Sequence, residues 1–285
     1  MTRFLNFLKK TYIFIILFLI YAPLIIVIFL SFTDPSSKGN INLNFSFNNG
    51  ENWLMLFQND EFLNALSNTA IIVIFTVPIS TIIATLTCFG IWNAKNVYKN
   101  ITLGSSKLNM IVPDIITGIS LALLFSLTII PMGVNLGFTT IILAHISFCT
   151  PYAILIIYPR MMKMKKNLIL ASMDLGYSKI YTFFKVIIPF LMPAIISAAA
   201  IVFSISFDDF IITKLVGGKV STISTEMYTM AKGIKAWAVT FGAIIVIFIF
   251  FLAFLIGIKK YLKERKHSNA FKSKFSKNIN KIYKL

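Results

Sequence analysis

The sequence predicts an all-α integral membrane protein with six transmembrane helices. Of its 285 residues, 57% are hydrophobic and only 13% are charged, whereas a soluble domain carries about a quarter charged residues. Because this number of polar side chains is too small to cover a water-facing surface, lipid must be the main solvent. The formal net charge of +17 indicates contact with an anionic membrane surface, because the basic residues lie between and after the apolar runs. We expect no nucleic-acid partner.

The first two spans are predicted at Tyr12–Ser31 and Leu66–Ile91. Each has the roughly 20 apolar residues that a helix needs to cross about 30 Å of hydrocarbon. The first follows basic residues, as a signal peptide would, but its apolar run of 19 residues is too long and no small-x-small cleavage site follows. We therefore expect an uncleaved span. Pro78 inside the second span is tolerable because neighbouring helices can satisfy the freed carbonyl.

Spans three and four come from one long stretch. Between Asp114 and Arg160 lie 45 residues without Asp, Glu, Lys or Arg, which is too long for one span and right for two. Pro and Gly residues at Pro131–Gly137 mark the break. We place span three at Leu108–Ile130 and span four at Phe138–Tyr158.

Spans five and six are predicted at Val186–Phe207, with the crossing itself starting near Phe190, and at Ala236–Ile258. The segment between them carries four lysines although it falls on the outer side. We therefore expect it to fold back partly into the protein. The permease domain is then residues 1–258, and residues 259–285 form a basic cytoplasmic tail, for which we expect disorder near anionic headgroups.

Basic residues set the orientation. Of the 27 Lys and Arg residues, 22 fall on one side of the six spans. The positive-inside rule places that side, and with it both termini, in the cytoplasm of a cell-membrane protein. These residues are Arg3, Lys9, Lys10, Lys95, Lys99, Lys107, Arg160, Lys163, Lys165, Lys166, Lys179, Lys185 and ten in the tail.

The chain lacks the motifs of an enzyme. There is no G-x-x-x-x-G-K-[ST] phosphate loop, so any ATP that drives transport is bound by another polypeptide. Cys88 and Cys149 lie in apolar runs without the spacing of a metal site, and we interpret them as packing residues. His145 on an apolar face is expected to be packed and hydrogen-bonded. We expect no catalytic residue, metal or cofactor.

The cytoplasmic loop 160–189 carries the most informative pattern. Leu170–Gly176 is followed by nine residues and then by Val186–Pro189. Gly176 can cap the end of one short helix, and Ser178 can cap the start of another. We call Ala171–Pro189 the elbow, and we expect it to present a compact knob to a cytoplasmic partner. An ordinary basic loop would leave the spacing between Gly176 and Pro189 unexplained.

The elbow resembles the E-A-A-x-x-x-G-x(9)-I-x-L-P motif of ABC-importer permeases, the coupling helix that docks on the ATPase. Three residues match outright, three match conservatively, and Leu170 stands where the motif has Glu. That departure removes any ion pair made by the Glu. The outright matches are Ala171, Gly176 and Pro189, and the conservative ones are Ser172, Val186 and Ile188. The resemblance implies ATPase coupling through Ala171, Asp174, Gly176 and Pro189.

Further segments resemble the spermidine/putrescine permeases, and the C-type subunit in particular. They are Pro113–Ile115, Leu136–Phe138, Ala144–Pro151, Asp174–Ser178 and Ser206–Phe210. The likeness covers most of residues 10–258. It implies the fold of a type I ABC-importer permease and a complex with a second permease, a cytoplasmic ATPase dimer and an extracytoplasmic polyamine-binding protein.

Acidic residues in the spans are candidate substrate contacts. Asp114, Asp208 and Asp209 lie in or at predicted spans, where a central carboxylate costs about 2.5–3.5 kcal/mol. A polyamine would offset this cost and the repulsion of adjacent acids. The alternative for Asp208 and Asp209 is that they mark the outer water boundary. Asp114 is expected nearly two turns into span three, where a carboxylate that snorkels to water is the alternative.

Two further residues join the predicted substrate pathway through the resemblance. Trp53 occupies the position of a Trp in the same external loop of polyamine permeases, which implies a cation–aromatic contact, although Trp is also common at membrane interfaces. Ser206 belongs to the S-x-D-D element and could bind a substrate amine. Glu226 and Tyr228 are weaker candidates.

Three other functions stay open. An ABC permease for another solute, such as an amino acid or an inorganic anion, shares the elbow, but the paired acids would repel an anion. An ion-driven carrier or channel that acts alone would not need the elbow. A purely structural membrane protein leaves the acids unexplained.

Overall fold

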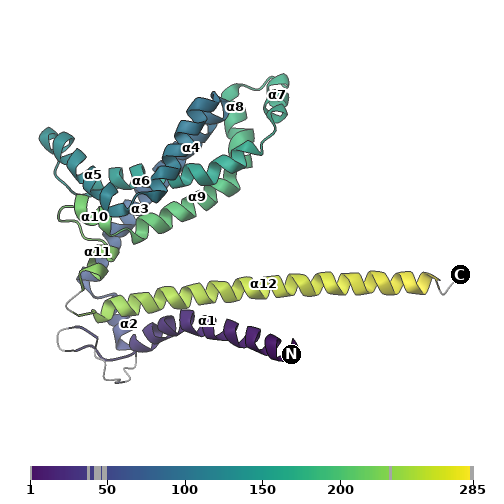
Figure 1. Ribbon diagram of the computed structural model, residues 1–285, viewed down its shortest axis with the longest axis horizontal. Helices are drawn as coiled ribbons and strands as arrows, with labels where there is room; N and C mark the ends of the chain where they lie inside the picture. The colour runs from purple at the N-terminus through teal and green to yellow at the C-terminus, as the bar shows by residue number, and fades with distance from the viewer. Residues whose placement is uncertain (1, 37–38, 42–45, 47–49, 231–232, 283–285) are drawn as a thin grey trace. The chain divides into compact units, whose positions relative to one another are not determined.

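The computed structural model describes residues 2–36, 39–41, 46, 50–230 and 233–282 (Figure 1). These residues form helices joined by loops, with two isolated β-bridges, Pro35 to Ile41 and Asn40 to Lys235. The helices are α1 (Thr2–Leu30), α2 (Glu51–Leu56), α3 (Asp60–Asn93), α4 (Asn96–Ile111), α5 (Asp114–Thr128), η1 (Ile130–Met132), α6 (Phe138–Met162), α7 (Lys166–Asp174), α8 (Lys179–Thr182), the π-helical η2 (Phe183–Ile187), α9 (Ile188–Asp208), α10 (Ile211–Val216), α11 (Ile223–Tyr228) and α12 (Ala236–Ile282).

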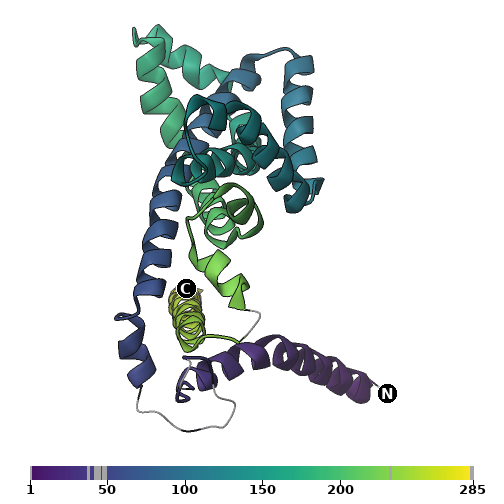
Figure 2. The ribbon, with the colours of Figure 1, turned by 90° about the vertical axis from the view of Figure 1, so that its left-hand side faces the viewer.

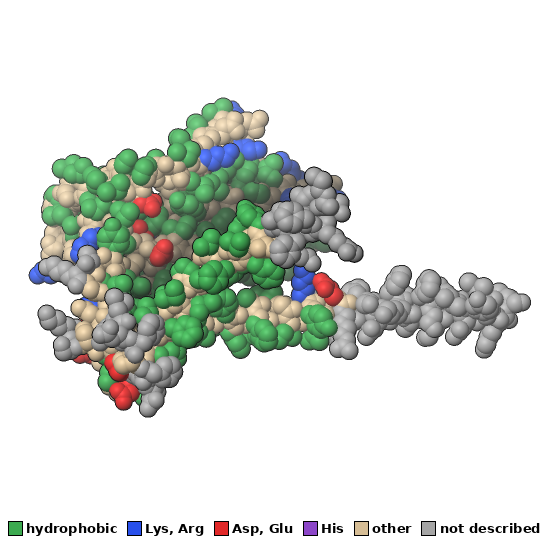
Figure 3. Space-filling view, turned by 60° about the horizontal axis from the view of Figure 1, so that its bottom comes forward, with side chains coloured by type: hydrophobic (Ala, Val, Ile, Leu, Met, Phe, Trp, Pro, Cys, Tyr) green, Lys and Arg blue, Asp and Glu red, His purple; other side chains and the backbone are tan. Residues whose placement is uncertain are grey.

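Six helical segments of the described chain are long and apolar enough to cross a membrane. Each overlaps one predicted span, which confirms their number. Hydrophobic side chains cover most of the coloured surface in Figure 3, as a lipid-facing surface requires. The segments are Thr11–Leu30, Asp60–Asn93, Asp114–Met132, Phe138–Met162, Lys179–Asp208 and Ala236–Leu262.

The chain divides into two compact units, Met1–Asn59 with Lys232–Leu285 and Asp60–Ala231. In the first unit α1 packs on α12, where the rings of Tyr21 and Phe250 lie 5.6 Å apart. The side-chain amide of Asn52 in α2 donates to the carbonyl of Thr33 at 2.7 Å. This bond holds α2 against the chain that leaves α1.

In the second unit α3, α6 and α9 pack against one another (Figure 2). Their contact surfaces include small residues that are completely buried, which lets the helix backbones approach closely at those positions. Cys88 and Cys149 are among them and are not bonded to each other, so their prediction as packing residues is confirmed. The others include Ala84, Ala144, Ala153 and Ala198.

Span three begins later than predicted. We expected it at Leu108–Ile130, but α4 continues to Ile111 and α5 starts at Asp114. Pro113 causes the break, because its ring disfavours the helical conformation of the preceding residue, and Val112 is extended with φ −69° and ψ 127°. Asp114 is therefore the first residue of a helix and does not lie two turns inside it. An acid at this end interacts favourably with the helix dipole.

Span five is continuous with the elbow. The helical run extends from Lys179 through η2 into α9, so the helix begins before the predicted Val186, and the start of the crossing near Phe190 stays a prediction. Pro189 has no backbone N–H to donate, and the π-helical stretch just before it changes the hydrogen-bond register locally. The proline is thus accommodated without ending the helix.

Span six also runs past its predicted end. The expectation of disorder after Ile258 is corrected, because α12 continues to Ile282. The segment contains no Pro and no Gly after Gly257, and its many Lys residues favour helix. Nothing in its composition therefore stops the helix once the apolar part has formed it.

The elbow has the predicted caps. After α7, Gly176 takes a left-handed φ of +84°, its N–H donates to the carbonyl of Met173, and the N–H of Tyr177 donates to that of Ser172. This is the Schellman arrangement. The hydroxyl of Ser178 accepts from the N–H of Tyr181 at 3.2 Å at the start of α8. Both predicted caps are confirmed.

The segment after span five folds back into the second unit, as expected from its lysines. Ile212, Thr213 and Val216 of α10 are buried, and α10 packs along α5. At this contact a Cβ on Gly118 would lie 2.7 Å from Cδ1 of Leu215. The glycine lets the two helices approach closely.

Replacing Gly118 by Val is expected to separate α5 from α10. The overpacked side chain should cost about 1–3 kcal/mol and lower the melting temperature of the purified protein. Gly104→Val is the matched control, because Gly104 also lies within a helix and has open space around its Cβ position. Equal melting temperatures for both variants would contradict the close contact.

Replacing Gly176 by Val is expected to open the last turn of α7. A β-branched residue at φ +84° is strained by about 1–2 kcal/mol. The backbone amides of residue 176 and of Tyr177 should therefore exchange hydrogen faster in the variant. Gly90→Val, at a helical glycine with open space, should leave exchange in α7 unchanged. Unaltered exchange in Gly176→Val would show that the turn does not need glycine.

Candidate functional site

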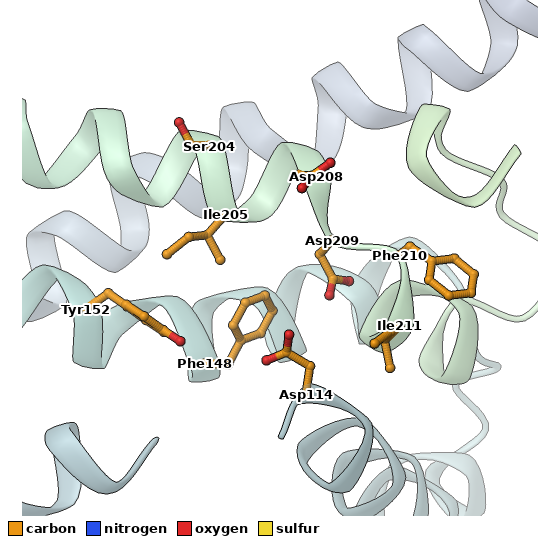
Figure 4. A pocket seen from close by; sticks show the side chains of 9 residues that line it. All are labelled: Asp114, Phe148, Tyr152, Ser204, Ile205, Asp208, Asp209, Phe210 and Ile211. Atoms are coloured by element: carbon orange, nitrogen blue, oxygen red, sulfur yellow. The ribbon is translucent and has the colours of Figure 1, made fainter. Parts of the chain in front are cut away.

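A cavity of about 500 Å³ lies at the C-terminal end of α9, where α5, α6, α9 and α10 meet. We call it the acidic pocket, because three of its lining residues are aspartates and none is basic. Figure 4 shows these side chains. The lining residues are Asp114, Phe148, Tyr152, Ser204, Ile205, Asp208, Asp209, Phe210 and Ile211.

The three acids differ in their surroundings. Asp114, at the start of α5, and Asp208, at the end of α9, are exposed. The side chain of Asp209 is only 7% exposed. In Figure 4 the carboxyl groups of Asp114 and Asp209 point toward each other, while that of Asp208 points to the other side. The pocket thus combines two accessible carboxylates with one that is nearly buried.

Buried polar side chains hold Asp209. Its Oδ2 accepts hydrogen bonds from the N–H and the hydroxyl of Thr213, at 2.7 and 2.8 Å. The Nε2 atom of His145 lies 3.4 Å from the same oxygen and 3.0 Å from the Thr213 hydroxyl. The Nδ1 atom of His145 lies 2.7 Å from the hydroxyl of Ser206. His145 is 1% exposed, which confirms its prediction as a packed, hydrogen-bonded residue.

The structure does not bring all predicted pathway residues together. Asp114, Asp208 and Asp209 share the pocket, whereas Ser206 is buried and faces His145. Ser204 lines the pocket in its place, because residues four apart share a helix face and residues two apart do not. The substrate roles of Ser206 and of the three acids stay predictions.

Trp53 belongs to the first unit. Its ring stacks on Phe32 with centroids 5.5 Å apart, and its indole N–H is buried without a hydrogen-bond partner among the described residues. In the second unit the ring of Tyr228, a weaker candidate, stacks on that of Phe210, a lining residue of the pocket. Glu226 lies in α11 as well but does not line the pocket.

Two aromatic lining residues from α6 were not predicted as site residues, and neither was Phe210. Phe148 and Tyr152 lie three and seven positions after His145 in α6, and this spacing puts all three on one helix face. The aromatic ring of Phe148 packs edge-on against the imidazole, with centroids 5.2 Å apart. Once His145 is known to lie beside Asp209, the spacing identifies both aromatics.

The elbow presents apolar side chains outward. Leu175 is 76% and Ile180 is 73% exposed, although both are hydrophobic. Behind them the hydroxyls of Ser172 and Thr182 lie 2.9 Å apart and are buried, which joins α7 to α8. Of the predicted coupling residues, Ala171, Asp174 and Gly176 are exposed in the elbow. Pro189 is the second residue of α9.

The acidic pocket and the elbow lie at opposite ends of one helix. Figure 1 shows α9 running from α8 to α10. With 21 residues, it is about 30 Å long, which equals the thickness of the hydrocarbon core. A single helix of about membrane thickness therefore joins the elbow to the pocket.

Solved structures confirm the fold. The chain is similar to a chain of a bacterial ABC transporter involved in the import of the acidic polysaccharide alginate, with a TM-score of 0.65 and 12% identity, over 90% of this chain and 96% of that one. It is also similar to a chain of the methionine ABC transporter MetNI, with a TM-score of 0.52 and 16% identity, over 70% of this chain and 96% of that one. The fold is that of a type I ABC-importer permease.

Curated relatives show the family, although no protein-family model matches the chain. The spermidine/putrescine transport system permease protein PotC homolog of Mycoplasma genitalium is 45% identical over 93% of this chain and 95% of that protein. The spermidine/putrescine transport system permease protein PotC of Haemophilus influenzae is 30% identical over 76% of this chain and 81% of that protein. The chain therefore belongs to the PotC family of ABC-transporter permeases, which are multi-pass membrane proteins.

Proposed function

We propose that the chain is the permease subunit of an ATP-driven importer of spermidine or putrescine and is not itself an enzyme. The observation that carries this proposal is the acidic pocket, whose lining has three carboxylates and no basic residue. Carboxylates at membrane depth indicate a function, and here their sign selects a cation. Relatives named as spermidine/putrescine permeases support the choice of polyamine.

The pocket suits a polyamine chemically. An ammonium group lowers the repulsion between nearby carboxylates, and the faces of Tyr152 and Phe210 can contribute about 0.5–2 kcal/mol each through cation–π contact. Phe148 and Ile205 offer apolar surface to the methylene stem. A cavity of about 500 Å³ also falls in the size range of small-molecule sites.

The elbow supports coupling to a separate ATPase. Its exposed apolar side chains are positioned by two capped helices, and exposed apolar patches mark protein contacts. In our proposal ATP binding closes the ATPase dimer and displaces the elbow. The motion opens the pocket outward, where a polyamine-binding protein delivers the substrate, and hydrolysis restores the inward state. A second permease completes the pathway, and both termini lie in the cytoplasm.

Other solutes and mechanisms fit less well. An inorganic anion would be repelled by the acidic pocket. A carrier that acts alone does not explain the capped, apolar elbow. The substrate's influence on the cycle depends on binding one of the two states more tightly than the other.

Asp114→Asn and Asp208→Asn are expected to raise the half-saturating polyamine concentration of ATP-dependent uptake by about tenfold each. This factor corresponds to about 1.4 kcal/mol, a modest value for a charge pair in a partly hydrated pocket. Radiolabelled spermidine uptake into proteoliposomes that contain the whole complex provides the measurement.

Asp60→Asn is the control for those variants, because Asp60 is exposed and does not line the acidic pocket. It should leave uptake unchanged, and all three variants should still assemble with the ATPase. Wild-type uptake in both pocket variants would contradict the proposed role of the acids.

Leu175→Asp is expected to lower polyamine-stimulated ATP hydrolysis at least about fivefold, because a charge would be buried without a partner at the ATPase contact. Val97→Asp introduces the same charge at another exposed position of the same unit and should have little effect. Full stimulation in Leu175→Asp would argue against docking through the elbow.

A further inference from the structure

The pocket's third acid differs from the other two in its bonding. Neither carboxylate of Asp114 or Asp208 accepts a hydrogen bond from any residue that the structure describes. By contrast, Asp209 Oδ2 accepts two bonds from Thr213, and Oδ1 lies 3.4 Å from the N–H of Ile212. The capacity of Asp209 to accept further hydrogen bonds is therefore largely used within the protein.

The donors can be assigned one by one. A carboxylate only accepts hydrogen bonds, so the Thr213 hydroxyl must donate to Asp209. That hydroxyl then accepts from Nε2 of His145, which lies 3.0 Å away. Nε2 therefore carries a hydrogen, and Nδ1 lies 2.7 Å from the hydroxyl of Ser206. Donation therefore runs from His145 through Thr213 to Asp209, and Ser206 joins the chain at Nδ1.

These four residues, which we call the polar unit, join three helices at one point. His145 comes from α6, Ser206 from α9 and Thr213 from α10. Asp209 occupies the break between α9 and α10, and the Ser224 hydroxyl donates to its carbonyl at 2.7 Å. Each side chain of the unit is at most 7% exposed. Buried polar groups that are fully hydrogen-bonded fix a unique local arrangement.

We infer that His145 is a positioning residue, which acts through Asp209 and sets the geometry of the polyamine site. The polar unit fixes the break after α9, and so places Asp208 on one side of the pocket and Asp209 opposite Asp114. Asp114 and Asp208 contact the ammonium groups, whereas Asp209 holds the pocket in shape. This inference rests on the proposed function and adds to it which acids bind the substrate and which residue orients them.

The test compares three replacements of His145 in the reconstituted complex. Gln carries its amide near the position of Nε2, so His145→Gln can still donate to Thr213, whereas His145→Ala cannot. We expect His145→Ala to raise the half-saturating spermidine concentration about tenfold and His145→Gln to stay within about twofold of the wild type. His145→Leu fills a similar volume without a donor, so a role in packing alone predicts that His145→Leu transports like His145→Gln, and that result would overturn the inference.

A double-mutant cycle tests the connection to Asp209. If His145 acts through this acid, adding His145→Ala to Asp209→Asn should change the half-saturating concentration by less than about twofold. Effects that multiply would contradict the inference. Thr213→Val should resemble His145→Ala. Thr85→Val is the control, because the Thr85 hydroxyl is also buried but bonds only the carbonyl of Thr81 within α3.

These experiments distinguish failure of the positioning role of His145 from failure of the proposed function. If Asp114→Asn and Asp208→Asn leave uptake unchanged, the proposed function of the pocket fails, whatever His145 does. If those variants are defective while His145→Ala transports like the wild type, the pocket stands and the positioning role fails. Co-purification of each variant with the ATPase shows that it has folded and assembled.

Discussion

Negative charge in an apolar setting must be balanced, and this requirement organises the region of the second unit where α9 meets α10. Asp209 is balanced from within, by Thr213 and by His145 beside it. Asp114 and Asp208 are left to water or to a cation. Because desolvation of an unpaired carboxylate is costly, the proposed function implies that the pocket closes only when a cation occupies it. The same acids can therefore provide both selectivity and a link between substrate binding and the conformational cycle.

Span five connects this chemistry to the elbow. Its helical run begins in the elbow and ends at the acids, and its middle packs against α3 and α6 through small, buried residues. The π-helical stretch before Pro189 is the point in this run where the hydrogen-bond register changes.

Much of this arrangement could be predicted from the sequence because lipid imposes long apolar helices and Gly and Ser impose recognisable caps. The number of spans, both caps of the elbow and the packed state of His145 are confirmed. The start of span three was missed because hydropathy does not register the break at Pro113. The length of α12 was missed because basic composition was taken for disorder. The burial of Ser206 was missed because it depends on the rotation of α9, which tertiary packing sets.

The most direct measurement of the central claim is an electron cryo-microscopy structure of the whole complex with spermidine held in the pathway. The account predicts an ammonium group within hydrogen-bond distance of Asp114 and of Asp208, with Asp209 still bound to Thr213 and beside His145. Spermidine bound away from these carboxylates, or a pathway in which a neutral or anionic solute occupies the acidic pocket, would contradict it.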